Sequence, residues 1–479
     1  MSGSSIRLKH PDKLFIDGRW VEPSTPQVFE VLNCATEEVA ATIAKGSSED
    51  MTRAVSAART AFDEGPWPRL SPQERGVYLA KIAERVESLN DELARGWSME
   101  TGIVYSRAKT FVGSVAANAF RQYSAMASTY EFVQPRVSDG DRAYRVMEPV
   151  GVVAAIVPWN GPAAMIAYKA APALLAGCTV VVKPAPEAPT AAYLMAEIME
   201  DVGLPPGVFN VVTADVAVSE ELVRNPDVDK ISFTGSPVAG RRIAAAAGER
   251  MARVTLELGG KSPAVVLDDY DIEQAANTLG TSYFCHMTGQ VCYSLTRIIV
   301  PRAKHDQMVD ALARIADSIV LGDPMDPGTQ SGPLANARQR DVVERYVAIG
   351  VDEGATLVAG GKRPAALEKG FFFEPTVFGD VRNDMTIARE EIFGPVLSVI
   401  PADSEEDAVR IANDTAFGLN AVVFTNDAER AVRIARQLRA GSVGHNATRI
   451  DFTIGFGGFN LDPPRWGVLS ERRDAEMPL

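Results

Sequence analysis

Residues 230–251, "KISFTGSPVAGRRIAAAAGERM", begin with a strand-like run, pass through a turn and continue into an apparent helix. Three apolar runs bounded by Gly or Pro precede this stretch: "GVVAAIVPW" (151–159), "CTVVVKPA" (178–185) and "VFNVVT" (208–213). Continuous β-branched runs of this kind are typical of strands that a parallel sheet buries on both faces. The pattern predicts a doubly wound, Rossmann-like α/β domain.

The same alternation resumes in the second half of the chain, after "RVTLELGGKSPAVVLDD" (253–269). An expected helix at 270–284 and an expected strand at 294–302 are followed by further pairs through 396–404 and 420–426. These runs predict a second doubly wound α/β domain. We expect four parts, namely a dinucleotide-binding domain (1–130 and 150–257), a projecting two-stranded oligomerisation arm (131–149), a catalytic domain (258–440), and a return segment with a tail (441–479).

Two stretches of the N-terminal part show helical periodicity. They are residues 49–64 and residues 71–102, "SPQERGVYLAKIAERVESLNDELARGWSMETG". Ser71, Pro72 and Glu74 have the pattern of a helix start, because a serine cap, a first-turn proline and a third-position glutamate favour it. We therefore expect long amphipathic helices here.

Composition excludes several classes of protein. A formal charge of −14 over 479 residues argues against binding nucleic acid or anionic lipid mainly by electrostatics. The sequence has no apolar run of the length that a signal peptide or a membrane span requires. Four scattered cysteines are too few for a disulfide framework, so we expect reduced thiols and a cytoplasmic protein.

The stretch "TGQVCYSLTR" (288–297) leaves Cys292 with four readings: buried spacer, redox partner, metal ligand or nucleophile. Cys285 and His286 lie nearby, but structural zinc needs four close ligands and the chain has no CxxC or HExxH spacing. We therefore expect no metal site. Cys285 is more typical of a small core residue.

Polar residues at expected strand ends allow both a functional and an ordinary reading. Asn160 is able to donate to an oxyanion or to form a common turn, and Lys183 is able to bind a ribose or phosphate or to be solvated. Gly235 and Gly240 flank the expected strand-to-helix turn, where phosphates bind helix N-termini, but their GxxxxG spacing also suits a plain turn. Glu257, in an apolar strand, suits a general base or a buried ion pair.

The order of these residues carries more information than any one of them. The motifs PWN, VKPA, FTGS, ELGGKSP, GQxC and EExFGP occur in sequence between residues 158 and 395. In this order and spacing the chain resembles the aldehyde dehydrogenase superfamily. The likeness extends from "LFIDGRWVEP" (14–23) to "FGGF" (456–459).

The resemblance implies a role for each motif residue. Cys292 would attack an aldehyde, the Asn160 amide would stabilise the thiohemiacetal oxyanion, and Glu257 would activate the water that hydrolyses the thioester. Glu257 also separates this chain from the CoA-acylating branch of the superfamily. The residues implied in binding a nicotinamide dinucleotide are Lys183, Trp159, Gly235, Ser236, Gly240, Glu391 and Phe393.

Cofactor choice and substrate class follow less directly. Many NAD-preferring relatives carry a glutamate where this chain has Pro186, with Glu187 next, so a 2′-phosphate would meet less obvious repulsion here. We expect NAD as cofactor, with NADP as the alternative. The resemblance assigns the substrate pocket to Gly161, Met165, Tyr168, Val291 and Tyr293. Because these residues are apolar or aromatic and no arginine flanks Cys292, we predict a medium to bulky hydrophobic aldehyde, whether aromatic, terpenoid or aliphatic.

The chain departs from the superfamily after Phe459. It reads "NLDPPRWGVLSERRDAEMPL" in place of a Ser-Gly-x-Gly-Arg-Glu stretch and a closing strand. Adjacent prolines and the absence of alternating apolar residues do not favour a strand. We therefore expect a homodimer that pairs through the arm, with a tetramer as the alternative. A catalytically impaired homologue acting as a binding or structural protein is the competing functional hypothesis.

Overall fold

The computed structural model describes residues 6–138 and 141–448. The chain divides into two compact units, the first formed by Met1–Val31, Val39–Trp97 and Ala108–Leu256, and the second by the remaining residues. The division at Leu256–Glu257 lies next to the expected boundary. Two short segments that join the second unit, Leu32–Glu38 and Ser98–Arg107, were not expected. The predicted tail after Phe459 lies outside the described residues.

The first unit contains a seven-stranded sheet with the order β11-β10-β7-β8-β9-β1-β2. Strands β10, β7, β8 and β9 are parallel, whereas β1 is antiparallel to β9 and β2. The bounds are β11 Arg253–Glu257, β10 Lys230–Thr234, β7 Val152–Ile156, β8 Thr179–Lys183, β9 Phe209–Val211, β1 Leu14–Ile16 and β2 Arg19–Val21. The predicted parallel strands and the two opening strands are thereby confirmed.

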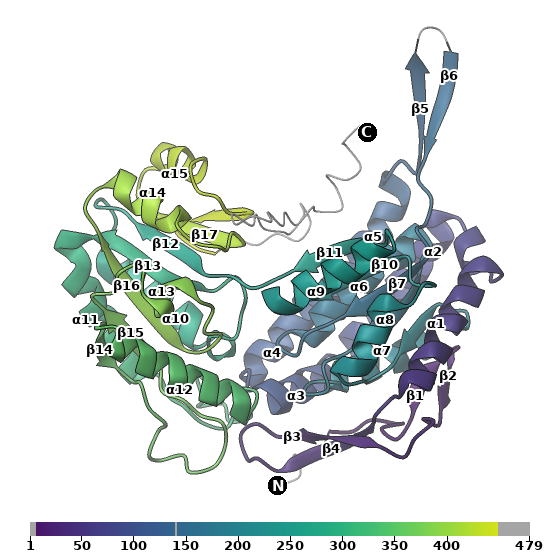
Figure 1. Ribbon diagram of the computed structural model, residues 1–479, viewed down its shortest axis with the longest axis horizontal. Coiled ribbons are helices and arrows are strands. Elements are labelled where there is room, and N and C mark those ends of the chain that lie inside the picture. Colours follow the sequence, from purple (N-terminus) through teal and green to yellow (C-terminus); the bar gives the residue numbers. More distant parts are fainter. Residues whose placement is uncertain (1–5, 139–140, 449–479) are drawn as a thin grey trace. The chain divides into compact units, whose positions relative to one another are not determined.

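Helices connect these strands and extend the N-terminal part (Figure 1). Their bounds are α1 Ser48–Asp63, α2 Pro72–Ser88, α3 Asn90–Thr101, α4 Tyr105–Phe111, α5 Ala117–Thr129, α6 Pro162–Ala176, α7 Thr190–Asp201, α8 Val216–Arg224 and α9 Pro237–Glu249. The predicted start at Ser71 is confirmed, because Ser71 and Glu74 form a reciprocal capping box. The helical stretch 71–102 consists of two helices, because Leu89 leaves the helical conformation at ψ 18° and separates α2 from α3.

The predicted arm is a hairpin of β5 (Val133–Ser138) and β6 (Asp141–Val146), which projects from the first unit in Figure 1. The two strands are antiparallel, with Val133 opposite Val146 and Pro135 opposite Tyr144. These four residues share one face because side chains alternate along a strand. Val133, Tyr144 and Val146 are 55%, 64% and 54% exposed, so the hairpin presents an apolar face.

The second unit contains another seven-stranded sheet with the order β14-β15-β16-β13-β12-β17-β18. All its pairs are parallel except β14 with β15. The bounds are β14 Thr356–Ala359, β15 Thr376–Gly379, β16 Val396–Ala402, β13 Leu295–Pro301, β12 Ser262–Val266, β17 Asn420–Phe424 and β18 Ser442–His445. This sheet confirms the second doubly wound domain that the sequence predicts.

Both faces of this second sheet are covered by helices. Val266, Ile298 and Val422 pack with α10 (Ile272–Phe284) and α11 (His305–Ser318) on one face. Their strand neighbours Val265, Ile299 and Val423 pack on the other face, with α12 (Ala337–Asp352), α13 (Thr386–Arg389), α14 (Glu405–Asn413) and α15 (Ala428–Ala435). Burial on both faces explains why these strands are continuously apolar.

Within the described part of the chain, no helix combines the length and the apolar character that spanning a membrane requires.

Candidate active site

Three predicted site residues lie at the carboxyl ends of neighbouring strands in the first unit. Asn160 follows β7, Lys183 ends β8 and Gly235 follows β10, and these strands are adjacent in the order β10-β7-β8. In open parallel sheets ligands bind outside this edge. The topology therefore gathers residues that are 75 positions apart in the sequence, from 160 to 235, at one edge.

Lys183 is only 9% exposed. Burial lowers the pKa of its ammonium to about 8, and the negative charges of Glu187 and Asp215 partly oppose that shift. Asp215 also forms an ion pair with Lys45 at 2.9 Å. The Lys183 ammonium at the end of β8 is therefore both buried and under the influence of two carboxylates.

The turn after β10 leads into α9 through Gly235 and Ser236. The Ser236 hydroxyl accepts a hydrogen bond from the Ala239 N–H and caps the helix, and Pro237 occupies its first turn. The expectation that Gly240 belongs to this turn is wrong. Gly240 is buried inside α9, and its N–H donates to the Ser236 carbonyl. Its predicted role at the cofactor would therefore rest on its small size.

The PWN segment leads into α6, which is almost wholly buried. Gly161, Met165 and Tyr168 are the half-buried exceptions in its first two turns. Their spacing of four and three residues places them on one face of the helix. A Cβ placed on Gly161 would meet no atom within 4 Å. The three pocket residues predicted in this unit therefore form one partly accessible stripe without a charged residue, and Trp159 and Asn160 just before it are also half-buried.

In the second unit, Glu257, Cys292 and Glu391 surround the Gly259–Gly260 turn. The Gly260 N–H donates to Glu391 Oε1 at 3.0 Å. A Cβ on Gly259 would overlap the Glu391 carboxylate, and a Cβ on Gly260 would overlap the Cys292 carbonyl oxygen. Only glycine allows both approaches. The predicted nucleophile and two carboxylates of the site are thus brought into one cluster.

The Cys292 thiol is held in its neutral form in this cluster. Its pKa is raised to about 12, first by burial and then by the negative charges of Glu391 and Glu257. The pKa of Glu391 is itself raised to about 7 by burial, against the opposing effects of the Gly260 N–H and the Lys261 charge. An apolar neighbour, Val291, is buried, whereas Tyr293 is half-buried. Burial and the two neighbouring carboxylates therefore both oppose formation of the thiolate.

The segment before Cys292 has a strained backbone. Met287, Thr288 and Gly289 all have positive φ, at 53°, 53° and 72°. The Thr288 hydroxyl donates to the Gly332 carbonyl at 2.9 Å, and the Gln290 side chain accepts from the Ala335 N–H at 2.9 Å. Positive φ is costly for a β-branched residue. These two hydrogen bonds hold the strained turn. The sequence did not predict a role for Thr288 or Gln290, because their hydrogen-bond partners are more than 40 residues away.

Two further residues of the second unit are close in sequence to members of the cluster. Phe393 has a φ of 58°, and its carbonyl accepts from Gln339 Nε2 at 2.9 Å. Lys261, which no sequence argument singled out, is fully buried beside the glycine turn. Burial lowers the pKa of its ammonium to about 7.

Cys285 and His286 are adjacent in the sequence and are both potential metal ligands. Within residues 6–138 and 141–448, no group of three or more His, Cys, Asp and Glu side chains is arranged to hold a metal ion. Cys285 is 2% exposed, as expected for a core residue. Burial and Arg107 lower the pKa of His286 to about 4.

Comparison with known proteins gives consistent matches over nearly the whole chain. The model described as "Aldehyde dehydrogenase family" matches residues 20–461. Geranial dehydrogenase of Castellaniella defragrans is 42% identical over 446 residues (93% of each chain), and betaine aldehyde dehydrogenase of Bacillus subtilis is 41% identical over 438 residues (90% of this chain, 89% of the relative). A mutant of aldehyde dehydrogenase C from Pseudomonas syringae, solved with NAD+ and octanal, is 42% identical with a TM-score of 0.91, covering 95% of this chain and 94% of that chain.

Replacing Glu391 with Gln should make Cys292 more reactive in the ligand-free protein. Removing the carboxylate charge lowers the thiol pKa, and a shift of up to one unit gives about a 3- to 10-fold faster alkylation by iodoacetamide at pH 8. Because Glu391 is protonated below its pKa of about 7, the difference should vanish as the pH falls below 7. The modification of the Cys292 peptide is followed by mass spectrometry.

The neighbouring Glu390→Gln provides the matched control, since the exposed Glu390 carboxylate accepts from the Tyr346 hydroxyl. Equal alkylation rates for wild-type and Glu391→Gln across this pH range would contradict the assigned charge coupling.

Proposed function

The chain belongs to the aldehyde dehydrogenase family and is an NAD(P)-dependent enzyme, and on that premise we propose that it oxidises medium to bulky hydrophobic aldehydes to carboxylic acids. The observation that carries the chemistry is the cluster of Cys292, Glu257 and Glu391 around the Gly259–Gly260 turn. The observation that carries the substrate class is the uncharged stripe of Gly161, Met165 and Tyr168.

In the first step, the Cys292 thiolate attacks the aldehyde carbon. A carbon–sulfur bond forms, the carbonyl π electrons move to oxygen, and the Asn160 side-chain amide donates a hydrogen bond to that oxyanion. The thiol is neutral in the resting cluster, so the proton must leave before attack. The nearby carboxylates Glu257 and Glu391 are the groups able to accept it.

In the second step, the thiohemiacetal becomes a thioester by losing its C–H hydrogen as hydride, which NAD accepts when bound. Hydrolysis then requires a water whose proton passes to Glu257 as its oxygen attacks the thioester carbon. The carbon–sulfur bond breaks, Cys292 leaves as thiolate, and the carboxylic acid is released.

The first unit suits the binding of a dinucleotide. Ser236 caps the 13-residue helix α9 directly after a strand, and its N-terminal N–H groups suit a pyrophosphate. Lys183 would hold the adenosine ribose, and Glu391 and Phe393 the nicotinamide ribose. We propose NAD rather than NADP, because Glu187 and Asp215 act on Lys183 and would repel a 2′-phosphate. The NAD+ bound in the Pseudomonas syringae structure supports this proposal.

The proposed substrate class is supported by two of the relatives. One is named a geranial dehydrogenase and another was solved with octanal, and both compounds are apolar aldehydes of medium size. A third relative is named a betaine aldehyde dehydrogenase, so substrate class must be tested directly on this chain. Val291 and Tyr293, the sequence neighbours of Cys292, are the other two residues that we propose contact the substrate.

We also propose a homodimer that pairs through the arm, and a cytoplasmic location. An isolated two-stranded hairpin is marginally stable in water, so its exposed apolar face is suited to packing against a second copy of the chain. All four cysteines are free thiols, which is compatible with a reducing compartment.

The mechanism predicts different defects for two variants. Cys292→Ala should form no NADH above background, because no thiohemiacetal forms. Glu257→Gln should retain a first turnover and then lose about 100-fold or more in steady-state rate, as general-base catalysis commonly contributes this much. A stopped-flow trace should then show a burst approaching one NADH per site. Full activity in Cys292→Ala would refute the mechanism, and an inactive wild-type protein would favour a binding or structural role.

The substrate proposal predicts the ranking in a panel measured with both cofactors. Octanal, geranial and benzaldehyde should exceed betaine aldehyde and succinic semialdehyde in kcat/KM by about 10-fold or more, since apolar pockets discriminate at this level. The value of kcat/KM should be higher with NAD than with NADP, and Glu187→Gln should reduce the ratio of these two values. Faster oxidation of betaine aldehyde or succinic semialdehyde would reject the hydrophobic pocket.

The arm proposal predicts that Tyr144→Asp lowers the molar mass in solution. A charge in the apolar face should weaken dimerisation by about 10-fold or more, because burying an unpaired carboxylate costs several kcal/mol. Light scattering after size exclusion reports the mass. Val320→Asp, at another exposed valine, should leave the dimer intact. A monomeric wild-type protein, or an unchanged dimer in Tyr144→Asp, would contradict the arm as the interface.

A further inference from the structure

A buried tryptophan contacts the segment that carries the proposed oxyanion donor. Trp97 lies in α3 and is 4% exposed. Its indole Nε1–H donates to the backbone carbonyl of Asn160 at 3.0 Å. Both residues belong to the first unit. The hydrogen bond therefore links a helix to a turn that is 63 residues further along the chain.

The turn that receives this hydrogen bond has little support from its own helix cap. Gly161 occupies the N-cap position of α6 with φ −152° and ψ 54°, and it contributes no side-chain cap. A serine or aspartate cap would normally fix such an entry. The space around Gly161 is open to any added Cβ. Contacts from elsewhere in the fold, such as the bond from Trp97, therefore contribute to holding the chain between β7 and α6.

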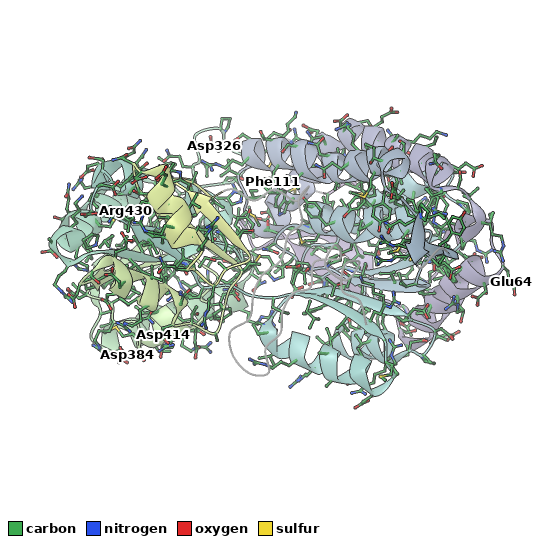
Figure 2. The ribbon with its side chains drawn as sticks, turned by 90° about the horizontal axis from the view of Figure 1, so that it is seen from above. Glu64, Phe111, Asp326, Asp384, Asp414 and Arg430 are labelled. Atoms are coloured by element: carbon green, nitrogen blue, oxygen red, sulfur yellow. The ribbon has the colours of Figure 1, made fainter. Side chains whose placement is uncertain are left out.

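Trp97 is itself held firmly enough to serve as an anchor. Its ring packs against Phe111, which is labelled in Figure 2, with centroids 5.8 Å apart and planes at 59°. The preceding residue, Gly96, lies so close to Thr190 that a Cβ would overlap the threonine side chain. This contact fixes α3 against the start of α7. The indole is thus placed by packing on both sides of its position in the helix.

From these contacts we propose that Trp97 is a positioning residue, which orients the Asn160 side chain by fixing the peptide group that follows it. A hydrogen bond to the Asn160 carbonyl restricts rotation about ψ of that residue. The direction of the side-chain amide depends on the backbone that carries it. Since oxyanion donors act only within a narrow distance range, a small rotation of this peptide would weaken catalysis. The inference rests on the proposed role of Asn160.

The test compares Trp97→Phe with a matched control, Trp67→Phe. Trp67 is fully buried in the same unit, and its indole N–H has no hydrogen-bond partner among the described residues. Both variants lose a similar volume, but only Trp97→Phe loses the contact to Asn160. At saturating NAD and octanal, Trp97→Phe should slow single-turnover NADH formation by about 5- to 10-fold, the range of one hydrogen bond. Trp67→Phe should stay within about 2-fold of wild type, since it loses none.

A double-mutant cycle with Asn160→Ala separates positioning from general destabilisation. If Trp97 acts through Asn160, Trp97→Phe should cause no further slowing in the Asn160→Ala background. The inference would be overturned if the rate reductions of Trp97→Phe and Asn160→Ala multiplied in the double variant, or if Trp97→Phe and Trp67→Phe reacted at equal rates. Either result would leave the proposed function intact. A wild-type rate in Asn160→Ala would instead remove the oxyanion role itself, and the inference with it.

A shape-preserving variant covers the case in which Trp97→Phe does not fold. Incorporating 3-benzothienylalanine at position 97 replaces the indole N–H with sulfur and keeps the ring size. The same slowing should appear, and it should again be absent in the Asn160→Ala background. A rate equal to wild type would overturn the inference.

Discussion

The candidate active site depends on the close approach of three backbone segments at Gly259 and Gly260. Neither residue could carry a Cβ, because the Glu391 carboxylate and the Cys292 carbonyl occupy that space. Next to this turn, the Lys261 carbonyl accepts from buried Arg297, which also donates to the Ile411 and Ala412 carbonyls. The guanidinium therefore joins the turn to the end of α14. A change at the turn would move the nucleophile and a carboxylate of the site together.

This compact arrangement accounts for the electrostatics of the resting site. Burial raises the pKa of the Cys292 thiol, the negative charges of Glu391 and Glu257 raise it further, and burial also raises the pKa of Glu391. The thiol is consequently protected from reaction in the absence of ligands, because only the thiolate is nucleophilic. A positive charge brought close to the cluster would lower the thiol pKa again. If this charge belonged to a bound ligand that takes part in the oxidation, the reactive thiolate would form mainly when that ligand is present.

The sequence predicts the layers of the fold better than its breaks. Continuous β-branched runs identify the buried strands of both sheets, and Ser71 with Glu74 identifies a helix start, because these signals are local. The break at Leu89 and the placing of Gly240 inside α9 depend on how neighbouring elements pack. Residues 32–38 and 98–107 belong to the second unit because of contacts with segments that are distant in sequence.

For the candidate site, the order of the motifs predicts the reactive residues, and the fold shows which other residues hold them in place. The residues next to Cys292 in the sequence are not distinctive. Its proposed role follows from its occurrence together with Asn160 and Glu257 in a particular order. Thr288, Gln290 and Trp97 escaped sequence reasoning because their hydrogen-bond partners are 44, 45 and 63 residues away. A threonine, a glutamine or a tryptophan carries no signal of such a partner. Residues that support a site are therefore harder to predict than those that react in it.

The central claim is that oxidation proceeds through a covalent bond to Cys292, and mass spectrometry of a stalled reaction tests it most directly. Glu257→Gln mixed with NAD and octanal should accumulate a species heavier by the aldehyde mass less two hydrogens. Peptide mapping should place that mass on Cys292. This difference identifies a thioester, whereas a thiohemiacetal would add the full aldehyde mass. Formation of NADH with Cys292 unmodified, or the acyl mass on another residue, would contradict the account.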